Sequence, residues 1–221
     1  MMAYRFQVPA KPMASPVATH SLLAQVLGIT GFGLCITAYA AYLFQGLDSF
    51  SIGLIAMLIG FGVLFGINAA RANEALALGL FYLFAFLEGV GIAPTIHNYL
   101  QAVGPAPVVN AALTTGVGMF ALAAIVYTTG LDLRRFSGWL YGALLVAILG
   151  GIVLLFVHFI QPATYSWIVL VIFTGLVLVD FARIRAGGDR LNPVQLAVQI
   201  YLDALNIFLL LLQIFGGRRR A

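Results

Sequence analysis

The chain has 221 residues, of which 62% are apolar and only 8% are charged. Soluble domains are about 45–50% apolar and about 25% charged, so a soluble fold of this length could not bury so much apolar surface. The composition excludes a soluble enzyme and a disordered regulator, and the single cysteine, Cys35, excludes an intramolecular disulfide. The net charge of +4 does not indicate a nucleic-acid partner, because most arginines stand at the ends of apolar runs and form no basic stripe.

Long apolar runs predict how often the chain crosses a membrane. A hydrocarbon core about 30 Å thick is spanned by a helix of about 20 apolar residues. Seven such runs occur, at approximately 21–44, 51–70, 75–99, 108–128, 139–160, 163–182 and 194–215. Because the runs are continuous rather than alternating, they are typical of helices and not of barrel strands. We therefore predict an all-α polytopic membrane protein, with a seven-transmembrane-helix bundle as its single domain.

The predicted membrane domain covers 21–217, between a short N-terminal tail, 1–20, and a basic C-terminal tail, 218–221. Lys and Arg gather in the N-terminal tail and in alternate connections, which the positive-inside rule places in the cytoplasm. The N-terminus is therefore predicted to be cytoplasmic, and a bacterial chain of this kind would lie in the cell inner membrane. Seven spans place the C-terminus outside, where the arginines at 218–220 oppose the rule. A last segment that re-enters the membrane and returns therefore stays open as an alternative.

Small residues and one proline predict how the helices meet. Two GxxxG motifs, at 62–66 and 138–142, favour close helix contacts. We expect these contacts to lie within the bundle, with an oligomer interface as the alternative. Pro94, near the end of the third run, predicts a kink that frees backbone carbonyls.

Three carboxylates inside apolar runs are the strongest functional signal: Glu88, Asp180 and Asp203. An ionisable group in lipid costs several kcal/mol unless it is paired or hydrated, so such groups mark functional sites by default. Asp203 lies about 15 Å along the last run, near the middle of the bilayer. Asn206 is three residues later and shares its helix face.

Asp180 has two possible roles. It lies near the predicted cytoplasmic end of the sixth run, where an ion pair with Arg183 or Arg185 is the structural alternative. The short hairpin at 186–193 makes the last two runs antiparallel neighbours. Helix rise alone separates the two aspartates by about 7 Å along the membrane normal, a gap that tilt or a bend would close.

If the aspartates meet, they share a proton and titrate as a coupled pair. Carboxylates and freed carbonyls suit a hard cation such as calcium, so the predicted site is a pH-gated cation path or a proton relay. Glu88 either lines the same path or pairs with Arg71 or His158, and His97 and His158 are expected to be interfacial. No zinc or nucleophile motif is present, so neither a cofactor nor an enzymatic activity is predicted.

The last two runs carry a recognisable signature. Asp180-Phe-Ala-Arg-Ile, then Asn192-Pro193, then Tyr201-Leu-Asp-Ala-Leu-Asn-Ile-Phe208 closely resemble the C-terminal pattern of the Bax-inhibitor (TMBIM) family, over roughly 174–217. A weaker match covers 84–96 in the third run, preceded by Arg71.

The resemblance implies a seven-helix fold with the last helix at the centre and a pH-sensitive calcium leak. Its sensor would be a hydrogen-bonded aspartate pair, here Asp180 and Asp203, which calcium would contact in transit. Arg71 would match an arginine that interacts with the pair when the path is closed. Some bacterial relatives restrain an FtsH-type membrane protease, so an interaction protein is the second hypothesis. The chain departs from the family at 181–183, where Phe-Ala-Arg replaces the frequent Asp-Thr-Gln.

Overall fold

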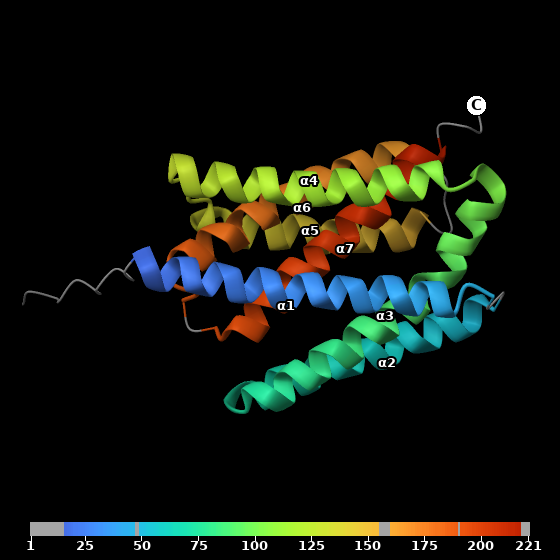
Figure 1. The fold of residues 1–221 in the computed structure, drawn as a ribbon. Helices are drawn as coiled ribbons and strands as arrows, with labels where there is room; N and C mark the ends of the chain where they lie inside the picture. Colours follow the sequence, from blue (N-terminus) through green and yellow to red (C-terminus); the bar gives the residue numbers. More distant parts are fainter. Residues whose placement is uncertain (1–15, 47–48, 155–159, 190, 218–221) are drawn as a thin grey trace, which may run out of the picture.

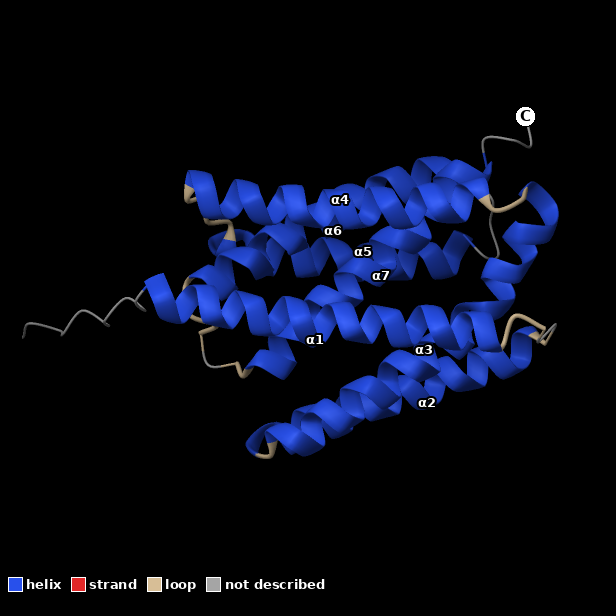
Figure 2. Cartoon of the chain, in the orientation of Figure 1, coloured by secondary structure: helices blue, strands red, loops and turns tan. Residues whose placement is uncertain are grey.

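The structure is a computed structural model that describes residues 16–46, 49–154, 160–189 and 191–217, with side chains from residue 21 onward. Within these ranges it contains helices and loops and no strand (Figure 2). Seven helices are long and apolar enough to cross a membrane, which confirms the predicted fold class. They are α1 (Pro16–Leu43), α2 (Phe50–Ala69), α3 (Glu74–Val103), α4 (Ala106–Thr129), α5 (Ser137–Leu154), α6 (Pro162–Arg185) and α7 (Pro193–Gly217), with 3-10 turns η1 (Ala70–Ala72) and η2 (Arg134–Phe136).

The ends of the chain differ slightly from the predicted boundaries. Helix α1 begins at Pro16, inside the predicted tail, although its membrane-spanning part begins at Ser21. Helix α7 is continuous to Gly217, so the re-entrant alternative is wrong. The described chain therefore starts and finishes at opposite ends of the bundle (Figure 1). The arginines at 218–220 lie outside the described residues.

Helix α7 is the centre of the bundle and crosses it obliquely (Figure 1). It packs against α1, α3, α4 and α6, whereas α2 packs on α3 and α5 on α6. On one side of α7, Tyr201 is fully buried, with its ring edge-on to Phe81 and Phe84 at centroid distances of 5.4 and 5.7 Å. Its hydroxyl lies 2.6 Å from the Thr37 hydroxyl, which donates to the Ala85 carbonyl at 2.9 Å. This cluster joins α1, α3 and α7, so it fixes the rotation of α7 about its axis.

Glycines allow close helix contacts, and the tightest of these lie outside the predicted motifs. A methyl group at Gly89 would meet the backbone of Thr37, and one at Gly53 would lie 2.9 Å from the Gly91 carbonyl. In contrast, a methyl group at Gly62, Gly138 or Gly142 would meet nothing within 4 Å. Packing of the motif at 138–142 within the bundle was therefore a wrong prediction, and in the motif at 62–66 only Gly66 packs inside, with Leu80 Cδ1 3.5 Å from where its methyl group would lie. The motif spacing marks a smooth helix surface, but it does not say whether that surface faces protein or lipid.

Pro94 lies inside α3, which turns in its last third (Figure 1). Proline removes a helical hydrogen bond and its ring presses on the preceding turn, which accounts for the predicted kink. The kinked helix still continues to Val103, four residues beyond the end of the predicted run.

Candidate functional site

The two aspartates of the last two helices meet. Asp180 and Asp203 are 4% and 6% exposed, and their carboxyl groups lie near enough to interact directly. The tilt of α7 across α6 closes the separation expected from helix rise (Figure 1). An ionised carboxylate only accepts hydrogen bonds, so a bond between two carboxyl groups requires that one of them carries a proton. The geometry therefore matches a pair that shares one proton.

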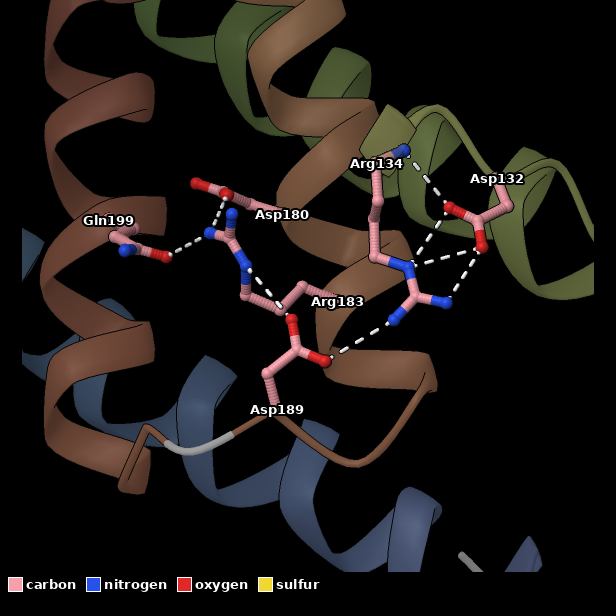
Figure 3. A network of polar contacts seen from close by, with 6 residues as sticks. All are labelled: Asp132, Arg134, Asp180, Arg183, Asp189 and Gln199. Atoms are coloured by element: carbon pink, nitrogen blue, oxygen red, sulfur yellow. Dashed lines mark hydrogen bonds and ion pairs between the residues drawn. The ribbon is translucent and has the colours of Figure 1, made fainter. Parts of the chain in front are cut away.

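Arg183 neutralises this pair. Its Nη1 donates to Asp180 Oδ1 at 2.7 Å and to Gln199 Oε1 at 2.8 Å, so one nitrogen joins α6 to α7 (Figure 3). Arg185, the alternative partner from the sequence, instead donates to the carbonyls of Val126 and Gly130 at the end of α4. The ion pair with Arg183 and the aspartate pair, which the sequence offered as alternatives, are both present.

From Arg183, a series of ion pairs extends to the loops at the end of the bundle where α6 ends. Arg183 Nε lies 3.6 Å from Asp189 Oδ2, and Arg134 Nη1 lies 3.3 Å from Asp189 Oδ1. Arg134 also holds Asp132 at 2.8 Å, and its hydrogen bonds to that carboxylate lower the pKa of Asp132 to about 2 (Figure 3). These outer groups are one-third to one-half exposed, so each pair contributes little to stability.

The aspartate pair opens into a pocket of about 440 Å³ between α5, α6 and α7. Four polar residues of α7 line it at helical spacing: Gln199, Asp203, Asn206 and Gln213. Sequence reasoning named the middle two and missed both glutamines, although spacings of four, three and seven residues place all four on one helix face. Asn206 Nδ2 donates to the Leu202 carbonyl at 2.7 Å, which leaves its side-chain oxygen to the pocket.

Neighbouring helices complete the pocket wall. Ser166 of α6 donates to Gln213 Oε1 at 2.5 Å, at the end of the pocket away from Asp180. Tyr165 of α6 donates to the Ala147 carbonyl of α5 at 2.7 Å. Tyr141 of α5 lines the pocket close to Arg183, a contact that nothing in the sequence indicated. The pocket is thus polar along α7 and mostly apolar along α5 and α6.

Glu88 lies on the other side of α7. Its Oε1 is 3.4 Å from where a methyl group at Gly60 would lie, and its charge acts on Tyr201. Tyr201 and Asp203 are two residues apart, so they point to opposite sides of α7, about 200° apart. Glu88 does not line the pocket of the aspartate pair, and among the described residues it makes no ion pair with Arg71. The other suggested partner, His158, lies outside the described residues.

Arg71 is also away from the pair. Within the described ranges, the guanidinium that reaches Asp180 belongs to Arg183 and not to Arg71. The backbone carbonyl of Arg71 instead accepts from Asn192 Nδ2 at 3.1 Å, where η1 meets the start of α7. The described residues contain no group of three His, Cys, Asp or Glu side chains that could hold a metal ion, so amide oxygens would have to complete any cation site.

Comparison with known proteins agrees with this architecture. The family model "Inhibitor of apoptosis-promoting Bax1" matches residues 19–220. Inner membrane protein YbhL of Escherichia coli is 26% identical, over 90% of this chain and 93% of its own length. A membrane protein of Streptococcus pyogenes is 26% identical over 91% of this chain and 95% of its own, and one of Vibrio cholerae is 25% identical over 90% of each. The chain is a multi-pass membrane protein that belongs to the Bax inhibitor family.

Proposed function

We propose that the chain is a pH-sensitive cation leak in the cell inner membrane, with calcium as the transported ion and the Asp180–Asp203 pair as the gate. One observation supports this most directly: two buried carboxyl groups, one from each of the last two helices, lie against each other beside a pocket whose α7 face is polar. Such groups are expensive in a membrane and mark ion or proton pathways. The inner-membrane location and the cytoplasmic N-terminus follow from the name of the Escherichia coli relative and from the loop charges.

In the proposed mechanism the singly protonated pair carries one negative charge, which Arg183 balances. This closed arrangement ties α6 to α7 through the carboxyl–carboxyl bond and through the Arg183 contacts with Asp180 and Gln199. A second proton removes the negative charge, so Arg183 loses its ion-pair partner and the two helices separate. Calcium then passes along the polar face of α7 down its gradient. Arg183 takes the role that the resemblance gave to Arg71.

The experiment is calcium entry into dye-loaded proteoliposomes from pH 8 to pH 5, with the wild type beside Asp203→Asn. We expect wild-type flux to rise as the pH falls. We expect the variant to lose most of this pH dependence, because the remaining single carboxyl group can no longer share a proton with Asp203. Flux that is flat in the folded, inserted wild type would contradict the proposal, and so would a variant whose pH profile equals that of the wild type.

Asp132→Asn is the control for surface charge. The pKa of Asp132 is lowered to about 2, so any stability from its ion pair is present above the usual carboxyl pKa and is lost only as the pH falls toward 2. Asp132 therefore stays ionised throughout the assay, and its variant should keep the wild-type pH profile. A changed profile would move the sensor to the connections at the membrane surface.

A second candidate function is restraint of an FtsH-type membrane protease. The outward face of α5 supports it, because Gly138 and Gly142 lie in open space and Trp139 is 82% exposed. Gly142→Leu should then reduce co-purification of the protease. Gly62→Leu, at an equally open glycine on α2, should leave it unchanged. If both variants co-purify the same amount of protease, α5 is not the face that binds it.

A further inference from the structure

We propose that one acyl chain of a zwitterionic phospholipid lies in an apolar groove between α1 and α4, against the central helix α7. The groove is on a different side of α7 from the aspartate pocket. The proposal concerns lipid binding and goes beyond the proposed leak. Its tests measure binding and not flux, so a failure of either proposal leaves the other standing.

Helices α1 and α4 leave a groove between them. Both pack against α7, but they make little contact with each other, and parts of α6 and α7 are visible between them in Figure 1. The groove has a volume of about 600 Å³. Small-molecule sites in proteins usually have volumes of about 300–1,000 Å³. Buried residues of α6 and α7 form its floor, namely Phe181, Ile200, Ala204 and Leu205.

The groove is open along its side. Gly31, Cys35 and Tyr42 of α1 line it and are exposed, and so are Gly116 and Phe120 of α4. Both helices are membrane spans, so the medium at this opening is hydrocarbon rather than water. An acyl chain can therefore enter from the side without crossing a polar layer.

The length and the lining of the groove fit an alkyl chain. Its walls run along α1 from Leu27 to Tyr42 and along α4 from Val108 to Ala123, which is about 22 Å of each helix. Half of a hydrocarbon core is about 15 Å thick, so a chain from one leaflet fits this length. Three threonines lie in the walls, but Thr30 and Thr37 donate to backbone carbonyls and the Thr115 hydroxyl is covered by protein atoms. The groove thus presents an apolar surface.

The headgroup would lie at the end of the groove where α1 ends. Tyr42 and Gln45 border the groove there, and both are exposed. Tyrosine is favoured at the level of lipid headgroups. The neighbouring connections, 44–49 and 104–105, contain no Lys or Arg that would attract an anionic headgroup. This end of the groove therefore fits a zwitterionic headgroup such as that of phosphatidylethanolamine.

The bound chain would contact α7 on the side away from the aspartate pocket. The groove borders Ile200, Ala204 and Phe208, whereas the pocket borders Asp203 and Asn206. Since successive residues of a helix are about 100° apart, the two sets point to different sides of α7. An acyl chain in the groove supplies van der Waals contacts to α1, α4 and α7 at once. We therefore expect this lipid to be held more firmly than the lipids around the bundle.

The first test is native mass spectrometry of the full chain, released from membranes in a detergent that removes loosely bound lipid. We expect the wild type to retain one phosphatidylethanolamine per chain. A methyl group at Gly31 or Gly116 would meet nothing within 4 Å, so Gly31→Leu and Gly116→Leu place a side chain in the groove without a clash. Each should lower the fraction of chains that retain the lipid at least about fivefold.

Gly28→Leu and Gly118→Leu are the matched controls. These two glycines lie on the same helices and also face open space, but they are not among the residues that line the groove. Both variants should retain lipid as the wild type does, and thermal unfolding checks that all four variants fold. Equal retention in groove variants and controls would overturn the proposal. Retention of phosphatidylglycerol in place of phosphatidylethanolamine would also overturn it, and so would a dimer that only the groove variants lose, because a second copy would then be the occupant.

Cys35 provides a second test on the wild-type chain. It is the single cysteine, it is exposed, and it lines the groove. Delipidated protein is alkylated with a lipid-soluble maleimide, with and without added phosphatidylethanolamine, and a bound acyl chain should slow the reaction at least about threefold. Leu58→Cys with Cys35→Ser is the control, because Leu58 is exposed on α2 away from the groove, and its rate should not change. An unchanged rate at Cys35 would overturn the proposal even if the glycine variants did not fold.

Discussion

Asp180→Asn is expected to raise calcium flux at pH 8 by about tenfold or more, to the level that the wild type reaches only at acid pH. Asparagine has the shape of the protonated acid but no charge, so Arg183 loses its ion pair with α6. A hydrogen bond to a charged group contributes about 1.5–3 kcal/mol, and its loss corresponds to a factor of roughly ten to a hundred between closed and open forms. The measurement is calcium entry into proteoliposomes over the pH range used for the wild type.

Glu88→Gln is the control for this variant. It also removes a carboxylate from a membrane span, but on the side of α7 that faces α2 and α3. Its flux should keep the pH dependence of the wild type. If Asp180→Asn stays acid-dependent, or if Glu88→Gln abolishes the dependence, the gate does not lie at the aspartate pair.

Gly89→Ala should destabilise the bundle by about 2–3 kcal/mol, near the upper part of the range for overpacked cores. The added methyl group would meet the Thr37 carbonyl, the Thr37 Cα and the Ala40 Cβ, so α1 would have to move away from α3. Backbone atoms of a packed helix cannot turn aside as a flexible side chain does. The measurement is the thermal or denaturant unfolding of the purified protein in a fixed detergent.

Gly79→Ala on the same helix provides the comparison. A methyl group there would meet nothing within 4 Å, and alanine is a better helix former than glycine by about 0.5–1 kcal/mol. This variant should therefore be as stable as the wild type or slightly more stable. If both variants unfold alike, the close approach of α1 and α3 at Gly89 is not important for stability.

The sequence by itself determined the number and approximate bounds of the membrane helices. Hydrophobic length is a local property, so an apolar run of about 20 residues predicts a span without knowledge of its neighbours. The third span shows the limit of this reading. The prediction ended it at residue 99, but α3 continues past Pro94 to Val103, because a proline kinks a helix without always ending it.

The tertiary structure alone decided how the site is assembled. Asp180 and Asp203 meet because of the tilt of α7, and Glu88 is kept apart because of the rotation of α7 about its axis, which the Tyr201 cluster fixes. Arg71, Arg183 and Arg185 have the same chemistry, and only the packing of the helix ends places Arg183 against Asp180 and Arg185 against α4. The tilt and rotation of α7, and the choice of one arginine among three as the partner of Asp180, depend on contacts between segments that are distant in sequence. The periodicity of apolar residues along the chain carries no information about such contacts.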